Sequence, residues 1–177
     1  KKENNPSVAD NQNNETTAEP TTEEETTTKV PTVEVDLMMI GDMLMHEGVV
    51  KSGLMDDGTY NFDHLYTNIA KDISSADIKI VNQETILGGS DFAYTGYPTF
   101  NSPWALGDAE VKAGFNIILH ATNHTLDKGL KGVENCLSFW KTYHPDTPVL
   151  GINETEEDYE NIYVYEKEGF KIAFLNY

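Results

Sequence analysis

Three short apolar segments, separated by stretches with helical periodicity, constrain the fold more than any other feature of this sequence. Residues 35–40, 78–81 and 115–119 are dominated by Val, Ile, Leu, Met and Phe, which is typical of buried β-strands. Apolar residues recur at helical spacing in 62–74, and the segment 103–114 begins with Pro and ends with Gly, as helices commonly do. Strands that alternate with helices predict a parallel α/β sheet.

The C-terminal part of the sequence continues this alternation. Apolar residues at helical spacing predict a helix over 129–142, and a short strand follows at 147–151. Residues 161–177 have the pattern of a β-hairpin that turns at Glu168-Gly169. We expect the three apolar segments to be parallel neighbours in one sheet, with the helices at 62–74 and 129–142 covering one of its faces.

Polar side chains follow each of the three apolar segments at the point where the strand ends. Asp42 follows the first, Asn82 and Glu84 follow the second, and Asn123 and His124 follow the third. The carboxyl ends of parallel strands meet at one edge of a sheet, so these side chains are expected to converge. Carboxylate, amide and imidazole ligands suit Mn, Fe, Zn or Mg. Each motif alone has a plainer reading, because Asn82 or Glu84 could simply cap the next element.

The charge balance excludes one class of function. The formal net charge is −18, and all 12 basic residues are Lys. A nucleic-acid-binding protein needs a basic surface to neutralise phosphates, so nucleic acid is excluded as a partner. The absence of Arg also removes the usual bidentate clamp for anions, which leaves a metal ion or helix N-termini to bind them.

Residues 1–32 differ in composition from the rest. They contain eight Thr and six Glu but no aromatic residue, Leu or Ile. Such a segment cannot bury enough apolar surface to offset its ordering entropy, so we predict a disordered tether, with folding beginning at Val33. It resembles the stalk that follows a lipidated cysteine in bacterial surface lipoproteins. A frayed terminus or an expression remnant is the alternative.

Four further residues with reactive side chains have structural interpretations. The single cysteine, Cys136, excludes an intrachain disulfide and lies at helical spacing with apolar neighbours, which predicts a buried thiol. His120 ends an apolar strand and is predicted to be a satisfied core or edge imidazole. His64 is expected on a helix surface, and His144 in a loop before proline.

Four stretches of the sequence together resemble a known family: MIGDMLMH, VNQETIL, PTFNSPWALGDAEVKAGFNIILHATNHTLDKG and EGFKIAFLNY. They are similar to the poly-γ-glutamate capsule biosynthesis (CapA-like) family, which is related to the calcineurin-like metallophosphatases. The resemblance runs over residues 33–177 and implies a four-layer α/β/β/α sandwich. The family's domain is longer, so we expect this sequence to correspond to its N-terminal half.

The resemblance assigns roles to the polar strand ends. Asp42, Glu84 and Asn123 are implied as metal ligands, which makes a divalent ion (Mn, Fe, Zn or Mg) the expected cofactor. His124 is implied to meet the substrate anion or leaving group, and Asp127 to orient its imidazole.

Other implied roles are less direct. The related phosphatases place a His two residues after the first Asp, but Leu44 stands there; His46 could substitute as a ligand or could be a surface residue. Asn82 and Asn101 are the expected substrate contacts. Those enzymes complete the site with His from later strands, so we expect the sequence given to hold too few ligands for two metals.

The resemblance implies a metal-dependent hydrolase or transferase that acts in capsule synthesis on an anionic envelope polymer or its precursor, such as poly-γ-glutamate. The alternative is a non-catalytic surface protein that binds or guides such a polymer within a membrane assembly complex. Both place the protein outside the cytoplasm, anchored through a lipid upstream of residue 1.

Overall fold

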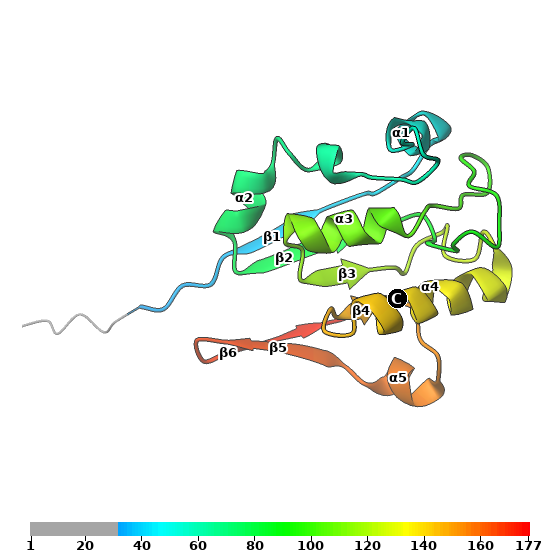
Figure 1. Ribbon diagram of the computed structural model, residues 1–177. Coiled ribbons are helices and arrows are strands. Elements are labelled where there is room, and N and C mark those ends of the chain that lie inside the picture. Colours follow the sequence, from blue (N-terminus) through cyan, green and yellow to red (C-terminus); the bar gives the residue numbers. More distant parts are fainter. Residues whose placement is uncertain (1–31) are drawn as a thin grey trace, which may run out of the picture. The chain divides into compact units, whose positions relative to one another are not determined.

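Four parallel strands form the main sheet in the computed structural model, which describes residues 32–177 (Figure 1). The spatial order follows the chain: β1 (Leu37–Ile40), β2 (Ile78–Asn82), β3 (Ile117–Leu119) and β4 (Val149–Leu150). Leu37 pairs with Ile78, and Ile80 pairs with Ile117. The prediction that the three apolar segments are parallel neighbours is confirmed. The predicted tether, apart from Thr32, lies outside the described residues and stays a prediction.

The helical segments connect these strands. Their bounds are α1 (Glu47–Ser52), the 3₁₀ helix η1 (Asp63–Leu65), α2 (Ala70–Ser75), α3 (Ala105–Ala113), α4 (Gly129–Tyr143) and α5 (Glu156–Glu160). As predicted, α3 ends at Gly114, whose φ of 106° lies in the left-handed region that glycine adopts without strain.

The predicted helix over 62–74 is wrong in its continuity, because turns at 66–69 separate η1 from α2. The Thr67 hydroxyl donates to the Asp63 carbonyl at 3.3 Å. In a continuous α-helix that carbonyl would accept from the backbone N–H four residues on, so the hydroxyl competes with the helical hydrogen bond. Phe62 and Ile73 are nevertheless both fully buried, so the apolar residues at helical spacing reach the core from two short helical elements instead of one.

Helices α1 to α4 pack on one face of the sheet. Val81 and Ile118 point to this side and share a core with Phe62 and Ile73, and with Phe139 of α4. The two predicted covering segments therefore lie on the same face, as expected. Each fully buried side chain of this size contributes about 1.5–3 kcal/mol to folding.

A β-hairpin covers the opposite face. Strands β5 (Tyr163–Lys167) and β6 (Phe170–Phe174) are antiparallel and turn at Glu168 and Gly169, whose φ angles are 49° and 86°. Two positive φ angles match the twist of a two-residue hairpin, so the predicted turn is confirmed. The inward side chains, Tyr163, Tyr165, Ile172 and Phe174, pack on Ile78, Ile80 and Ile117 of the main sheet.

Helices, sheet and hairpin therefore form three layers, with α3 and the hairpin on opposite sides of the main sheet (Figure 1). Strand β2 is buried on both faces, as neighbouring Ile80 and Val81 show, with 3% and 0% exposure. In the edge strand β1, Leu37 and Met39 are exposed. This is the α/β/β part of the expected α/β/β/α arrangement. Within residues 32–177, none of the helices combines the length and apolar character that crossing a bilayer requires.

Candidate functional site

The polar strand ends lie side by side at one edge of the main sheet. Backbone pairing continues just past the strands, since the Met43 N–H donates to the Asn82 carbonyl at 2.9 Å. The Gln83 N–H likewise donates to the Leu119 carbonyl at 2.9 Å. The segments after β1, β2 and β3 therefore leave the sheet together, as the parallel topology requires.

Asp42 and Asn82 form the first pair at this edge. The Asn82 side-chain amide donates a hydrogen bond to Asp42 Oδ1. Asp42 is exposed and Asn82 is half-buried, so the carboxylate keeps a solvent-facing oxygen that a ligand can reach. The amide holds the carboxylate in one orientation beside the end of β2.

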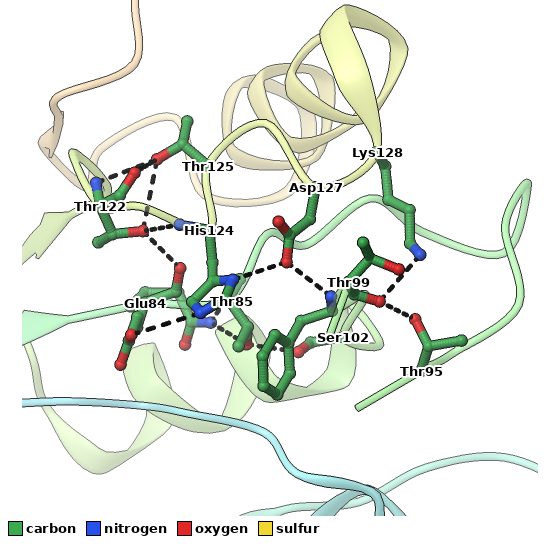
Figure 2. Close-up of polar contacts among 12 residues, drawn as sticks. Glu84, Thr85, Thr95, Thr99, Ser102, Thr122, His124, Thr125, Asp127 and Lys128 are labelled. Carbon is green, nitrogen blue, oxygen red and sulfur yellow. Dashed lines mark hydrogen bonds and ion pairs between the residues drawn. The ribbon is translucent and has the colours of Figure 1, made fainter. Parts of the chain in front are cut away.

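Glu84, His124 and Asp127 form a second group (Figure 2). His124 Nδ1 lies 2.8 Å from Asp127 Oδ2, and His124 Nε2 lies 3.9 Å from Glu84 Oε1. The three side chains are 13–16% exposed, so all are shielded but reachable. An ionised carboxylate only accepts hydrogen bonds, so Asp127 selects the tautomer with the proton on Nδ1. Nε2 is then the nitrogen that faces Glu84 and can exchange a proton.

Phe100 supports this group in two ways. Its backbone N–H donates to Asp127 Oδ2 at 2.6 Å, the same oxygen that faces His124. Its buried ring lies edge-on to the His124 ring, with centroids 4.5 Å apart. The other neighbour of the ring is His46, at 5.2 Å. His46 therefore lies near the group but is exposed, just before α1, and Phe100 stands between it and His124 in these contacts.

Asn123 faces a different space. It is exposed and lines an open cavity of about 710 Å³ with Leu126, Leu130 and Tyr177. Neither Glu84 nor His124 lines that cavity. The structure thus brings Glu84 and His124 together, while Asn123 of the same loop lines a separate cavity.

Asn101 was expected to contact substrate, but the structure buries it completely. Its side-chain carbonyl accepts from the Gly88 N–H at 2.9 Å, and its amide donates to the Gly89 carbonyl at 3.0 Å. The side chain is thereby used to hold the loop before α3. The prediction for Asn101 is corrected on this ground: no surface of it is available to a substrate.

The donor types at this edge fit a divalent metal. Asp42 and Glu84 supply carboxylate oxygens, and His124 supplies an imidazole nitrogen, which are ligands that Mn, Fe and Zn accept. These donors are not gathered at one position: residues 32–177 contain no group of three or more His, Cys, Asp or Glu that could hold a metal ion. Residues 32–177 therefore supply donor types that suit a metal, without three such donors grouped around one point.

His120 and Cys136 lie beneath the site loop as core residues. The Trp140 indole N–H donates to His120 Nε2 at 3.0 Å, and burial lowers the pKa of His120 to about 3. Cys136 Sγ lies 3.6 Å from the same nitrogen, and burial raises the pKa of the thiol to about 12. Both predictions of a buried structural role are confirmed. His64 is exposed, as expected.

Two residues of the site were not identified from the sequence. Phe100 acts through its backbone N–H, which no side-chain pattern reports. Thr122 lies within the family-like segment, and its hydroxyl contacts the backbone of both Glu84 and His124. Its position two residues before His124 was the available signal, because Ser and Thr hydroxyls often bond backbone two residues on.

The three-layer fold and the polar strand ends together define a metallophosphatase-like α/β protein. Residues 36–177 match the family described as bacterial capsule synthesis protein PGA_cap. Because the match covers most of the sequence, the chain belongs to this family, which supports a role in bacterial capsule synthesis. No curated protein matches the sequence.

Proposed function

We propose that this protein is a metal-dependent hydrolase or transferase that acts on an anionic capsule polymer or its precursor, such as poly-γ-glutamate. The observation that carries the proposal is the line of contacts from Asp127 through His124 to Glu84, with spacings of 2.8 and 3.9 Å. A carboxylate that fixes one imidazole nitrogen and leaves the other facing an acidic group is suited to proton transfer.

Separate residues of the chain would transfer protons, orient the imidazole and bind the metal. His124 Nε2 gives a proton to the leaving group or takes one from the attacking group. Asp127 holds the imidazole through Nδ1–H and stabilises its protonated form. Asp42 and Glu84 would hold the metal, together with donors from outside residues 32–177, while Asn123 lines the neighbouring cavity. When bound, a divalent ion polarises the scissile group and lowers the pKa of a water ligand.

Charge supports a metal-dependent substrate interaction. The chain carries a net charge of −18 and no Arg, so an anionic polymer approaching this surface is repelled unless cations intervene. Lys128, next to Asp127, donates to the Thr99 carbonyl at 3.1 Å (Figure 2). The single positive charge of Lys128 offsets little of this negative charge, and divalent ions would supply the remaining positive charge.

A second candidate is a non-catalytic protein that binds or guides the polymer. The absence of a three-donor group within residues 32–177 favours it, because a partial set of ligands can bind a cation-bridged polymer without catalysis. Both candidates require cations, so binding alone does not separate them, whereas turnover does.

The test is turnover by the full-length protein with Mn²⁺, using a generic phosphoester and poly-γ-glutamate as substrates. We expect His124→Ala and Asp42→Ala to abolish metal-dependent turnover while their melting temperatures stay close to wild type. His64→Ala is the matched control, because His64 is an exposed imidazole that contacts Ser52 away from the site. Normal turnover by either site variant would refute the catalytic proposal and favour the polymer-binding one.

We also propose that the protein works at the outer cell surface, held by a lipid upstream of residue 1. The Thr- and Glu-rich composition of residues 1–32, typical of an extended stalk, supports this. Fatty-acid labelling of the full-length protein in cells tests it, and an unlabelled protein recovered in the cytoplasm would refute it.

A further inference from the structure

We propose that Thr122 is a positioning residue that fixes Glu84 and His124 relative to each other. The proposal rests on the proposed function for its chemical meaning, because Glu84 and His124 are the facing pair of that site. The effect of Thr122 on the Glu84–His124 separation can be tested without reference to that function.

The Thr122 hydroxyl joins the two segments that carry this pair. It donates to the Glu84 carbonyl oxygen at 2.7 Å and accepts from the His124 N–H at 3.1 Å (Figure 2). A hydroxyl has one hydrogen and two acceptor lone pairs, so both bonds form at once. Thr122 thus bonds the backbone of both residues whose side chains meet at 3.9 Å.

This bridge lies just beyond the ladder between β2 and β3. The last backbone bond between the two segments runs from the Gln83 N–H to the Leu119 carbonyl at 2.9 Å. Past it the strands end, and the hydroxyl extends the connection to Glu84. Thr125 anchors Thr122 in turn: its Oγ1 accepts from the Thr122 N–H at 3.1 Å and donates to the His120 carbonyl at 2.5 Å.

The consequence concerns the gap between the two side chains. A separation of 3.9 Å between Glu84 Oε1 and His124 Nε2 is too long for a hydrogen bond, so the two groups face each other without closing on one another. A ligand that contacts both groups has to fit this gap, and misplacing a reacting group by about 1 Å can cost about a hundredfold in rate. Loss of the bridge should therefore disturb ligand binding more than folding.

Three variants separate positioning from general stability. Thr122→Val keeps the branched shape and removes the hydroxyl, whereas Thr122→Ser keeps the hydroxyl and removes the methyl group. Thr67→Val is the matched control, because the Thr67 hydroxyl bonds the Asp63 carbonyl within its own turn, far along the chain from the site. If Thr122→Val does not fold, Thr122→Ala removes the same hydroxyl.

The experiment combines crystal structures of the full-length variants with Mn²⁺ titration calorimetry. We expect Thr122→Val to change the Glu84–His124 separation by about 1 Å and to weaken Mn²⁺ binding about 10–100-fold, as loss of supporting contacts does elsewhere. Thr122→Ser and Thr67→Val should keep both near wild type. A merely structural role would lower the melting temperature of Thr122→Val without these changes.

An unchanged separation and affinity in Thr122→Val would overturn the proposal. If the wild-type protein binds no Mn²⁺, the proposed function fails instead, and the crystallographic separation still decides whether Thr122 positions the pair.

Discussion

Replacing Glu110 should stabilise the protein at neutral pH. Glu110 lies on α3 with no exposed surface, and within the described residues neither of its carboxylate oxygens has a hydrogen-bond partner. Burial raises the pKa of Glu110 well above its ordinary value of 4.5, because the low-dielectric interior disfavours the charged carboxylate. An unpaired buried polar group costs about 1–3 kcal/mol. Glu110→Leu, similar in volume, should recover that amount, which corresponds to about 3–9 °C in melting temperature.

The stability difference between Glu110→Leu and wild type should depend on pH in a definite direction. The folded pKa is raised, so the folded state binds the Glu110 proton more tightly than the unfolded state does. The resulting stabilisation is fully present below the unfolded pKa and is lost as pH rises from there toward the folded pKa. The advantage of Glu110→Leu over wild type should therefore grow as pH rises above about 4.5.

Thermal melts followed by circular dichroism between pH 5 and 9 test this. Glu110→Gln should also remove the pH-dependent part while keeping the shape. Glu134→Gln is the control, because Glu134 is an exposed glutamate on α4 that pairs with Lys131 at 3.5 Å. A pH-independent difference between wild type and Glu110→Leu, or a leucine variant less stable at pH 8, would show that the carboxylate has a partner and refute the reasoning.

Two further predictions concern the site loop and its surroundings. Asp127→Asn should cut metal-dependent turnover about 10²–10⁴-fold, because an amide can donate to His124 Nδ1 and favour the wrong tautomer; turnover within a factor of a few of wild type would contradict this. Gly151→Ala should destabilise the fold by about 1–3 kcal/mol or more in denaturant unfolding. The reason is a φ of 91° and an added Cβ only 2.4 Å from the Ala121 nitrogen, and an unchanged midpoint would count against that packing.

Most of the fold could be predicted because its signals are local and repeated. The short apolar segments, the glycine at 114 and the Glu168-Gly169 turn each carry a backbone preference that the tertiary structure did not override. The failure at 62–74 has a different cause. Apolar spacing reports which side chains are buried, but it does not report that Thr67 would compete for a helical carbonyl.

The site was predictable where side-chain chemistry and strand ends coincide. His124 and Asp127, three residues apart, do meet at 2.8 Å, and Glu84 does reach the same group. Sequence could not tell that Asn123 lines a cavity that neither Glu84 nor His124 lines, since the placement of one side chain depends on the loop's backbone. Sequence also could not tell that Asn101, a polar residue in a family-like motif, uses its side chain to form hydrogen bonds with the backbone of its own loop.

The double use of Asp127 Oδ2 has a mechanical consequence. One oxygen atom accepts from both the Phe100 N–H and the His124 ring, at 2.6 and 2.8 Å. Phe100 ends a segment closed by the bridge between Thr95 and Asn101, and its tip carries Tyr97, which is 79% exposed. A displacement of that tip that moves the Phe100 N–H would therefore also shift the oxygen that orients the His124 imidazole.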